Sequence, residues 1–368
     1  MKKEVKIIFH IDLNAFFATV SMINEPYLKN KVFVVGGSAM SSKGVISTAS
    51  YKARKLGIRS AMPISDAMRI YPKLLVVPVN FPEYIKYSNI FFEVLTTYSD
   101  KVLKGSIDEA YLDMTEASKT KHPLELAKEI QTKLNKEYNL PCSIGIAPTL
   151  FLAKTASDMK KPLGITVVRR KDIVKKIFPL PIKELFGMGK KTYPVIEKKG
   201  ILTIGDFTKK ENKEKILEVI TKESYDSFIN HILGYSTDII DPDKYNIPKS
   251  ISNETTFNYY LDNQDVLLQE LKNLFDTVYR RLTKYKLLAK TVTIKIRNSN
   301  FETITRSKSL TDYTNEYESF ETIMEELFFD NYHGDAIRLI GVGLGTIITK
   351  YDYREDYNLF TYQKLLEE

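Results

Sequence analysis

Three acidic residues lie at or near the ends of two apolar segments. Asp12 ends the apolar run of residues 5–12, and Asp108 and Glu109 follow a turn at Gly105. Such runs are typical of buried strands, where a carboxylate is costly unless it is paired or binds a metal. Two Mg²⁺ ions about 3.5–4 Å apart, held by carboxylates, can activate a hydroxyl group and stabilise a leaving pyrophosphate. From spacing alone, unrelated surface acids near turns remain an alternative.

The two consecutive acids cannot both point inward from a regular strand, because adjacent side chains of a strand lie on opposite faces. We therefore expect Asp108 to bridge both metal ions. Glu109 is expected to reach one of them from the irregular start of the strand.

The hydrophobic pattern of residues 5–168 alternates between strand-like and helix-like segments. Strands are expected at 5–12, 31–37, the first part of 45–57, both halves of 101–114, 142–147 and 165–168. Helices are expected at 16–23, the second part of 45–57, 83–98, 123–138 and 149–159. This order predicts an α+β sheet domain with a helical insertion after its first strand.

The rest of the chain predicts a helical region and a second sheet domain. Residues 170–235 are helical and rich in lysine, and 236–250 have the composition of a linker. Beyond them, strands are expected from 251, at 289–298, 301–310 and 337–348, with helices at 263–286 and 316–331. Within TVTIKIR (291–297) apolar and polar residues alternate strictly, so one face packs and the other could hold phosphates.

Charge is distributed unevenly along a chain whose formal net charge is +8. Residues 279–308 are strongly basic, with Glu302 as their single acid, whereas 309–337 contain acids and no Lys or Arg. Such segregation predicts one face for an anionic partner, although a lysine-rich solvated surface would also account for the total.

The composition indicates in which cellular compartment the protein acts. Cys142 is the single cysteine, which excludes an intramolecular disulfide and a cysteine zinc site. The apolar run near the N-terminus is too short for a signal peptide and is interrupted by His10 and Asp12. No apolar stretch has the length of a membrane span. We expect a cytoplasmic protein without a membrane partner.

Several segments together resemble the catalytic segments of Y-family translesion DNA polymerases, in the DNA polymerase IV branch. Their order and spacing match that family: FHIDLNAFFATVS (9–21), STASYKARKLGIRSAMP (47–63), SIDEAYLD (106–113) and SDMKKPLGI (157–165). In addition, KSISNETTF (249–257) is similar to the start of the family's little-finger domain. The resemblance covers nearly the whole chain, and the joint pattern is highly specific.

The resemblance implies roles for the residues of the active site. Asp12, Asp108 and Glu109 would be the catalytic metal ligands, together with the backbone carbonyl of Leu13, for two Mg²⁺ ions that Mn²⁺ could replace. The implied nucleotide-binding residues are Phe16, Phe17, Ser47, Thr48, Tyr51, Arg54 and Lys161.

Within that set the implied tasks differ. Phe17 would be the steric gate under the incoming sugar, and Ser47 and Thr48 would line the base pair. Tyr51, Arg54 and Lys161 would contact the triphosphate. Arg and Lys are the usual phosphate ligands, and Tyr51 and Arg54 share one face of a predicted helix.

One position departs from the family pattern. Many members have a second aspartate two residues after the first, whereas this chain has Asn14. In a regular strand the side chain of Asn14 would point away from the metals, so we expect activity to be retained.

Residues 182–206 resemble a helix-hairpin-helix, with the turn Gly187-Met188-Gly189 followed by Lys190. Small residues at a helix start allow backbone N–H groups to approach a phosphate without reading the base sequence. The DNA-binding set predicted here is Gly187, Gly189 and Lys190, joined in the second sheet domain by Lys295, Arg297 and Arg306.

The tail contains Asp356-Tyr357-Asn358-Leu359-Phe360, which resembles the pentapeptide that binds the bacterial sliding clamp. Leu359 and Phe360 match the family pattern. Asp356 and Tyr357 depart from it, which predicts weaker binding. An unstructured acidic tail is the alternative.

The resemblance implies a right-hand polymerase with a ferredoxin-like palm, small fingers, a helical thumb and a separate α+β little finger. The expected boundaries are palm 1–15 and 80–167, fingers 16–79, thumb 168–238, linker 239–245, little finger 246–350 and tail 351–368.

The implied reaction adds a dNTP to the 3′ end of a primer on a DNA template. Lesion bypass and error-prone synthesis follow from the family, and we expect a monomer with no proofreading exonuclease in these residues. A nucleotide cyclase on a similar palm and a non-catalytic DNA-binding scaffold are the rival hypotheses. The helix-hairpin-helix opposes the first, and the complete set of acids opposes the second.

Overall fold

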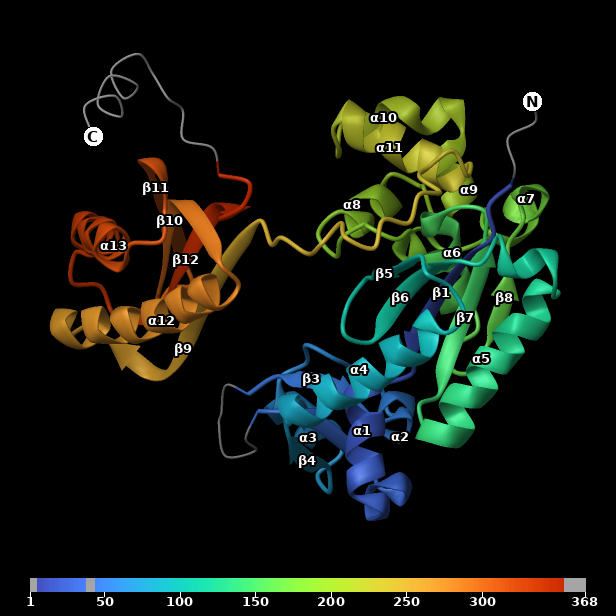
Figure 1. Cartoon of the computed structure of the whole chain (residues 1–368), viewed down its shortest axis with the longest axis horizontal. Coiled ribbons are helices and arrows are strands. Elements are labelled where there is room, and N and C mark those ends of the chain that lie inside the picture. The colour runs from blue at the N-terminus through green and yellow to red at the C-terminus, as the bar shows by residue number, and fades with distance from the viewer. Residues whose placement is uncertain (1–4, 38–43, 354–368) are drawn as a thin grey trace. The chain divides into compact units, whose positions relative to one another are not determined.

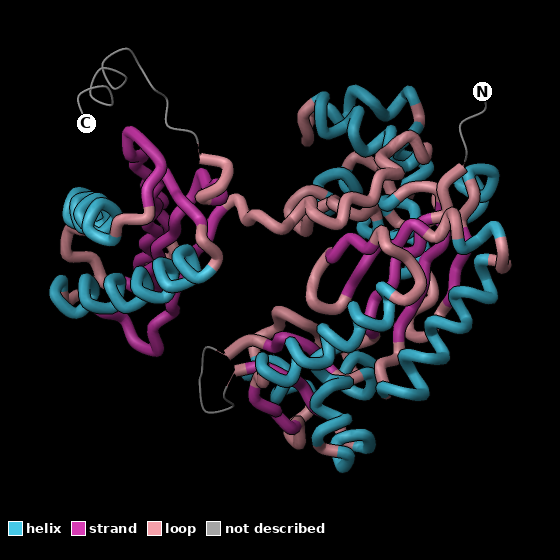
Figure 2. Tube along the Cα trace, viewed as in Figure 1, coloured by secondary structure: helices cyan, strands magenta, loops and turns pink. Residues whose placement is uncertain are grey.

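The computed structural model describes residues 5–37 and 44–353, and the chain divides into two compact units after Lys244. Figures 1 and 2 show that both units combine sheets with helices, which confirms the predicted α+β class. Within the described ranges, no helix is both long and apolar enough to span a membrane.

A five-stranded sheet forms the centre of the N-terminal unit. Its strands, in spatial order, are β5 (Val102–Lys104), β6 (Glu109–Asp113), β1 (Ile8–Leu13), β7 (Cys142–Ala147) and β8 (Ile165–Val167). Every neighbouring pair is antiparallel except β7 and β8, which are parallel. The strands predicted for this part of the chain are therefore confirmed.

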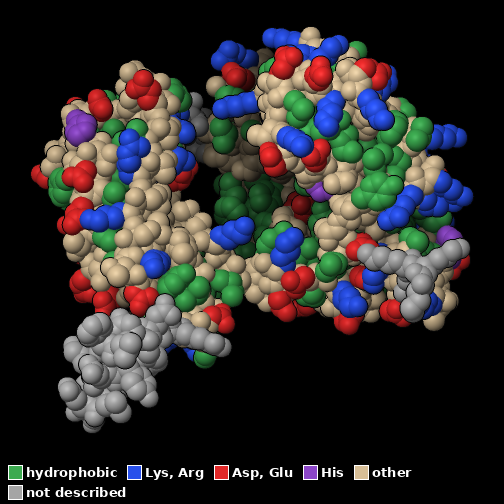
Figure 3. Space-filling model, turned by 90° about the horizontal axis from the view of Figure 1, so that it is seen from above, with side chains coloured by type: hydrophobic (Ala, Val, Ile, Leu, Met, Phe, Trp, Pro, Cys, Tyr) green, Lys and Arg blue, Asp and Glu red, His purple; other side chains and the backbone are tan. Residues whose placement is uncertain are grey.

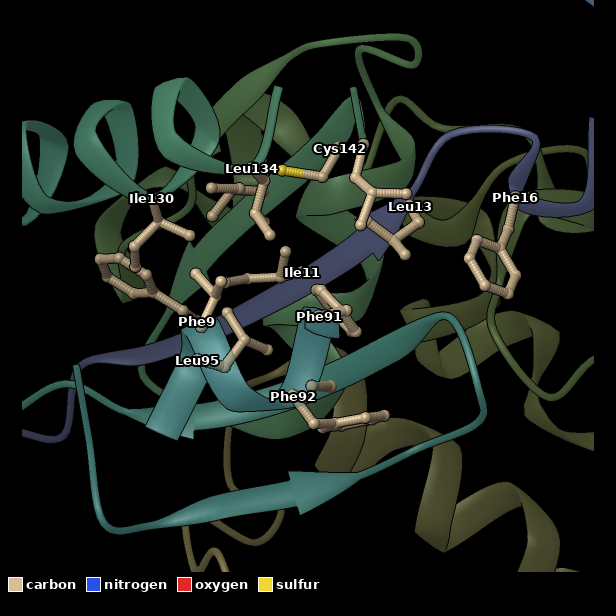
Figure 4. Packing of buried hydrophobic residues seen from close by; sticks show 14 of the residues in the cluster. Phe9, Ile11, Leu13, Phe16, Phe91, Phe92, Leu95, Ile130, Leu134 and Cys142 are labelled. Atoms are coloured by element: carbon tan, nitrogen blue, oxygen red, sulfur yellow. The ribbon is translucent and has the colours of Figure 1, made fainter. Parts of the chain in front are cut away.

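The central strand β1 is covered on both faces, which explains its unbroken apolar run. Phe9, Ile11 and Leu13 pack against α4 (Phe81–Thr96) and α5 (Pro123–Tyr138), as Figure 4 shows. The alternate residues of β1 face α6 (Leu150–Asp158), where His10 and Asp12 bond to side chains of that helix.

Helix α6 lies close to the sheet because β7 has no side chain at Gly145. A Cβ atom at that position would lie 2.0 Å from the carbonyl oxygen of Ala153 and 2.4 Å from the backbone nitrogen of Ser157. The close approach brings the polar side chains of α6 within reach of β1 and β6.

The insertion between β1 and α4 contains a small sheet as well as helices. Its elements are α1 (Phe16–Asn24), a 3₁₀ turn (Pro26–Asn30), β2 (Phe33–Gly36), β3 (Ile46–Ala49), α2 (Tyr51–Lys55), α3 (Ile64–Ile70) and β4 (Leu75–Pro78). The strand order is β3-β2-β4. The sequence analysis missed α3 and β4; β4 has four residues, too few for a period-two pattern to be distinctive.

Short helices follow β8, as predicted. They are α7 (Ile173–Lys176), α8 (Tyr193–Lys198), α9 (Ile204–Thr208), α10 (Lys213–Leu217) and α11 (Lys222–Ile232), with 3₁₀ turns at Arg170–Asp172, Ile182–Glu184 and Lys210–Asn212. Their buried side chains, among them Ile196 and Phe207, form one cluster with Leu152 of α6. The helical region is thereby anchored to α6, on the face of the central sheet that this helix covers.

The C-terminal unit is a four-stranded antiparallel sheet with two helices packed on one face. Its elements are β9 (Ser250–Leu261), α12 (Gln264–Lys284), β10 (Leu287–Asn298), β11 (Thr303–Thr314), α13 (Tyr317–Asn331) and β12 (Ile337–Thr349), and the strand order is β11-β10-β12-β9. Val292, Ile294 and Ile296 are buried against the helices. The predicted alternation of β10 is confirmed.

The segregation of charge along the sequence does not produce separate charged faces in this unit. Lys308 of the basic segment bonds to Glu326 of the acidic one, and Lys272 bonds to Glu321 and Glu325. Acidic and basic side chains intermingle on the face of the C-terminal unit drawn in Figure 3. Helix α13 carries the acids of these pairs, and its contacts with β11 and α12 bring the opposite charges together.

Candidate active site

A cleft of about 260 Å³ in the N-terminal unit collects most of the predicted site residues. It lies where β1, the start of α1, β3 and α2 meet the segments before β6 and after α6. Its lining consists of Asp12, Leu13, Asn14, Ala15, Phe16, Phe17, Ser47, Thr48, Tyr51, Arg54, Ser60, Asp108 and Lys161. Residues more than 100 positions apart in the sequence thus form one site.

The three predicted acids meet at the ends of β1 and β6. Asp12 and Glu109 are direct cross-strand partners, so their side chains lie on the same face. Asp108 precedes the first residue of β6, and its carbonyl accepts a hydrogen bond from the Leu13 backbone nitrogen at 2.9 Å. The irregular position is therefore Asp108, whereas we expected Glu109 to leave the regular strand.

Two lysines neutralise these carboxylates. The Lys154 ammonium donates to Asp12 Oδ2 at 3.2 Å and to Glu109 Oε2 at 2.5 Å, and Lys161 Nζ lies 2.7 Å from Asp12 Oδ2. Burial opposes the charge of Lys154, but Asp12, Asp158 and Glu109 outweigh it and raise the lysine pKa. Lys154 therefore remains a cation in a largely buried position.

The pKa values of Glu109 and Asp108 shift in opposite directions. The adjacent His10 ring, with Nε2 3.6 Å from Oε2, and the Lys154 ammonium lower the Glu109 pKa more than burial raises it. Burial raises the pKa of Asp108 more than its hydrogen bond from Ser106 lowers it, and the charge of Asp12 adds to the increase. Further positive charge would favour the ionised form of Asp108.

The donor set suits a divalent cation, although the side chains are not arranged as a ligand shell. Among the described residues no group of three His, Cys, Asp or Glu side chains is poised to hold a metal. Instead, the ammonium groups of Lys154 and Lys161 contact the oxygens that would be ligands. A hard cation could take the place of Lys154 between Asp12 and Glu109 once that side chain and Asp108 rotate.

Phe16 and Phe17 begin α1 after a left-handed turn at Ala15, and their environments differ. Phe16 is 2% exposed and belongs to the core, while Phe17 is partly exposed at the cleft. The Phe17 ring stacks on Tyr84 with centroids 4.2 Å apart and contacts Phe81 edge-on. Tyr84 is 1% exposed, so Phe17 rests against a rigid aromatic support.

Arg54 is held in place by its own neighbourhood. Its Nε donates to the Ala49 carbonyl at 2.9 Å, and its Nη2 donates to Thr48 Oγ1 at 3.3 Å. The guanidinium carbon lies 5.1 Å from the centre of the Tyr51 ring, which confirms that the two side chains share a face of α2. Arg54, Tyr51 and Lys161 all line the same cleft.

The predicted helix-hairpin-helix contains less regular helix than expected. Its first helix is the 3₁₀ turn Ile182–Glu184, and its second is α8. Gly187 has a positive φ of 90°, Met188 is buried, and Gly189 and Lys190 are exposed. The turn can therefore present its backbone to a partner.

The basic residues predicted on the second sheet lie on two faces. Lys295 and Arg297 project from the face without helices, where Lys295 pairs with Glu254 at 2.7 Å and Arg297 donates to Thr303. Arg306 is the cross-strand partner of buried Ile294, so it belongs to the helix-covered face. The structure does not bring Arg306 together with the other two. The predicted clamp-binding residues Leu359 and Phe360 lie outside the described residues.

Sequence reasoning missed Lys154, Ser60, Ser106 and Tyr84 as members or supports of the site. Lys154 had a usable signal, because it lies three or four positions before Ser157 and Asp158 and seven before Lys161, on one helical face. Tyr84 had none, since an aromatic residue in a helix is ordinarily a core residue.

Comparison with known proteins gives a consistent result. The impB/mucB/samB family model matches residues 11–158, and the model of that family's C-terminal domain matches 248–356. A DNA polymerase IV of Halalkalibacterium halodurans is 39% identical over 366 residues, covering 99% of this chain and 87% of that protein. A DNA polymerase IV of Bacillus subtilis is 37% identical, covering 99% and 87%.

Solved structures agree with these relatives. A Y-family DNA polymerase chimera has a TM-score of 0.82 at 27% identity, covering 94% of this chain and 100% of its own. An insertion ternary complex of Dbh DNA polymerase has a TM-score of 0.68 at 27% identity, with the same coverage.

The charge balance around Lys154 makes a testable prediction about stability. In EDTA, Lys154→Met should lower the free energy of unfolding by about 2–4 kcal/mol, because Glu109 loses its lysine partner and Asp12 keeps only Lys161. Adding MgCl₂ at about 10 mM should recover part of the loss, since a cation that binds only the folded state stabilises it. Urea unfolding with and without Mg²⁺ measures both effects.

The matched control is Lys119→Met, which removes an exposed ion pair with Glu116 and should leave the free energy of unfolding nearly unchanged in either buffer. An equal loss in EDTA and in Mg²⁺ for Lys154→Met would contradict the idea that the lysine and a divalent ion share one position.

Proposed function

This chain belongs to the impB/mucB/samB family and is a translesion DNA polymerase, and on that premise we propose that Asp12, Asp108 and Glu109 form its catalytic centre. The observation that carries the proposal is the cross-strand pairing of Asp12 with Glu109, with Asp108 beside them at the cleft. Family membership also resolves the rival hypotheses of a cyclase and of a non-catalytic scaffold in favour of a polymerase.

Divalent metal dependence follows from the family. We propose two Mg²⁺ ions, which Mn²⁺ could replace, held by Asp12, Asp108, Glu109 and the backbone carbonyl of Leu13. When bound, such a pair supplies a more acidic primer hydroxyl and charge stabilisation at the leaving pyrophosphate. The chain's own part is to hold the carboxylates at fixed positions on β1 and before β6, so that little reorganisation accompanies the reaction.

The cleft supports one arrangement of the incoming dNTP. Lys161, Arg54 and Tyr51 would bind the triphosphate, because they bring two cations and a phenolic hydroxyl to the lining of the cleft. Ser47 and Thr48 on β3 would contact the base pair. Phe16 would support Phe17 from the core, and Phe17 would exclude a ribose 2′-hydroxyl by the shape of its ring.

Primer-template DNA is the macromolecular substrate. We propose that the turn with Gly187, Gly189 and Lys190 binds its backbone, and that Lys295 and Arg297 do so on the open sheet face. Arg306 would contact DNA only from the edge strand β11, because it lies on the other face.

The corresponding division of the chain is a palm of 1–15 and 80–167, fingers 16–79, thumb 168–238, linker 239–245 and little finger 246–350. We also propose that the protein is a monomer and acts in the cytoplasm. Its tail, residues 351–368, would bind the sliding clamp. The clamp contact rests on Leu359 and Phe360, which are apolar residues in a polar, acidic segment.

Asp108→Asn tests the catalytic centre. It should reduce single-nucleotide insertion by about 10³-fold or more, because a ligand shared by both ions is lost. Primer-template affinity should be unchanged, since the DNA contacts lie elsewhere. Rapid-quench insertion and fluorescence anisotropy measure the two quantities, with Asp66→Asn, an acid paired with Arg69 on the surface of α3, as the control. Insertion by Asp108→Asn at the parental rate would refute the site.

Phe17→Ala tests sugar selection. An apolar pocket alone rejects an added hydroxyl by about 10²-fold, so discrimination should fall to that range once the ring is removed. The ratio of kcat/KM for a dNTP to that for the matching rNTP is the readout. Tyr84→Phe is the control, because it keeps the supporting ring and removes only a buried hydroxyl with no hydrogen-bond partner among the described residues. Unchanged discrimination in Phe17→Ala would assign that residue to the core alone.

Leu359→Ala with Phe360→Ala tests the tail. A tethered contact raises the local concentration of enzyme at the primer end, so its loss should reduce stimulation by loaded clamp by about 10²-fold. Synthesis without the clamp should be unaffected. Product length per binding event is measured with the clamp of the same organism. Tyr362→Ala with Gln363→Ala serves as the matched control in the same tail, and equal stimulation of all three proteins would rule out the proposed contact.

A further inference from the structure

Leu163 is fixed by two side-chain amides that come from different elements. Its backbone nitrogen donates to Asn14 Oδ1 at 2.9 Å, and its carbonyl accepts from Gln131 Nε2 at 3.0 Å. Leu163 has a φ of 62°, in the left-handed region that residues other than glycine rarely adopt. The N–H and the carbonyl of Leu163, whose backbone conformation is unfavourable, thus each have a side-chain hydrogen-bond partner.

The orientation of each amide follows from its partners. Asn14 is 1% exposed, and its Nδ2 donates to Ser143 Oγ at 2.9 Å, so its oxygen must face the Leu163 N–H. Gln131 on α5 donates from Nε2 to the carbonyls of Leu163 and of Cys142, the latter at 2.9 Å. Asn14 therefore acts on Leu163 as an acceptor, and Gln131 acts on it as a donor.

The residue held in this way lies two positions after Lys161. Lys161 Nζ contacts Asp12 Oδ2 and Asp158 Oδ1, each at 2.7 Å, and the side chain lines the cleft. On the other side of Leu163, the Gly164 carbonyl accepts a hydrogen bond from the Ile144 backbone nitrogen. The backbone after Lys161 is consequently fixed to β7, to α5 and to the turn after β1, and this determines where the ammonium group can reach.

We propose that Asn14 and Gln131, the amide pair, are positioning residues that hold Lys161 in place for the triphosphate of the incoming nucleotide. The proposal rests on the function proposed above for Lys161. In this proposal Asn14 holds the backbone of Leu163 and is not a metal ligand. Its side chain bonds to Ser143 and Leu163 rather than to Asp12, Asp108 or Glu109.

Replacing the side-chain amide by a carboxylate should be tolerated at Asn14 and harmful at Gln131. Asn14→Asp keeps an oxygen for the Leu163 N–H, and the Ser143 hydroxyl can rotate to donate to it. Gln131→Glu replaces a donor by a carboxylate that faces two carbonyl oxygens and can accept only. A role in packing alone would predict that both nearly isosteric changes are tolerated equally.

Steady-state single-nucleotide insertion on primer-template DNA measures the effect. Gln131→Glu should raise the KM for dNTP about tenfold and leave kcat within about twofold, because binding is weakened and the metal ligands are unchanged. Asn14→Asp should keep both constants within about twofold of the parent. Gln131→Met, which removes the donors without adding charge, should raise KM as well and serves where the glutamate variant fails to fold.

Lys161→Ala provides the second arm, because residues that act through one group are not additive with its removal. Lys161→Ala should itself raise the KM for dNTP, and Gln131→Glu should add less than about twofold in that background. Thermal unfolding and DNA affinity, measured for each variant, should stay close to the parent.

The outcomes separate the two proposals. If Lys161→Ala leaves KM unchanged, the function proposed for Lys161 is wrong. If Lys161→Ala raises the KM for dNTP but Gln131→Glu and Gln131→Met do not, the amide pair does not act through Lys161. The same conclusion follows if the Gln131 variants raise KM by the full factor in the Lys161→Ala background. Equal losses in Asn14→Asp and Gln131→Glu would likewise overturn the proposal.

Discussion

The rest of the N-terminal unit depends on keeping acidic side chains charged where the sheet is covered. Asp12 and Glu109 lie on one face of β1 and β6, and that face is closed by α6. Removing a carboxylate from water is expensive unless a cation accompanies it. The fold meets this requirement with Lys154 and Lys161, which come from α6 and from the turn after it. A helix that carries cations is thus required beside the strands that carry the acids.

The two faces of β1 divide the structural and chemical tasks. Phe9, Ile11 and Leu13 anchor the strand in an apolar cluster shared with α4 and α5, which fixes the position of its backbone. His10 and Asp12 on the other face belong to a hydrogen-bonded network with α6. Because side chains alternate along a strand, a fixed apolar face also fixes the position of the polar one. The position of the acids on that face is therefore set by the packing of apolar residues that take no part in the chemistry.

Local pattern was enough to predict most of the elements, and the resemblance of several segments to one family singled out the acids. Both failed where the outcome depends on partners distant in the sequence. The run ending at Asp12 and the turn at Gly105 are visible locally. The helical spacing of Lys154 is also visible locally, but its burial beside the acids is not, because that burial depends on Gly145 allowing α6 to approach. The face occupied by Arg306 depends on the register between β10 and β11. The packing of α13 against β11 pairs charges that the sequence separates into blocks, as Lys308 and Glu326 show.

If Lys161 binds the triphosphate and Asp12 binds a metal ion, as proposed above, then substrate binding exchanges one ion pair for two new contacts. Lys161 bonds to Asp12, so an arriving phosphate and a cation at Asp12 would satisfy both ends of that ion pair at once. Either binding step alone would leave one charge without a partner. If only the phosphate bound, Asp12 would lose Lys161 without gaining a cation. If only the cation bound, it would repel the Lys161 ammonium. Electrostatics therefore couples the two binding steps, provided that the backbone carrying Lys161 does not move with its side chain. Leu163, held at both its N–H and its carbonyl, is the residue at which the structure meets that condition.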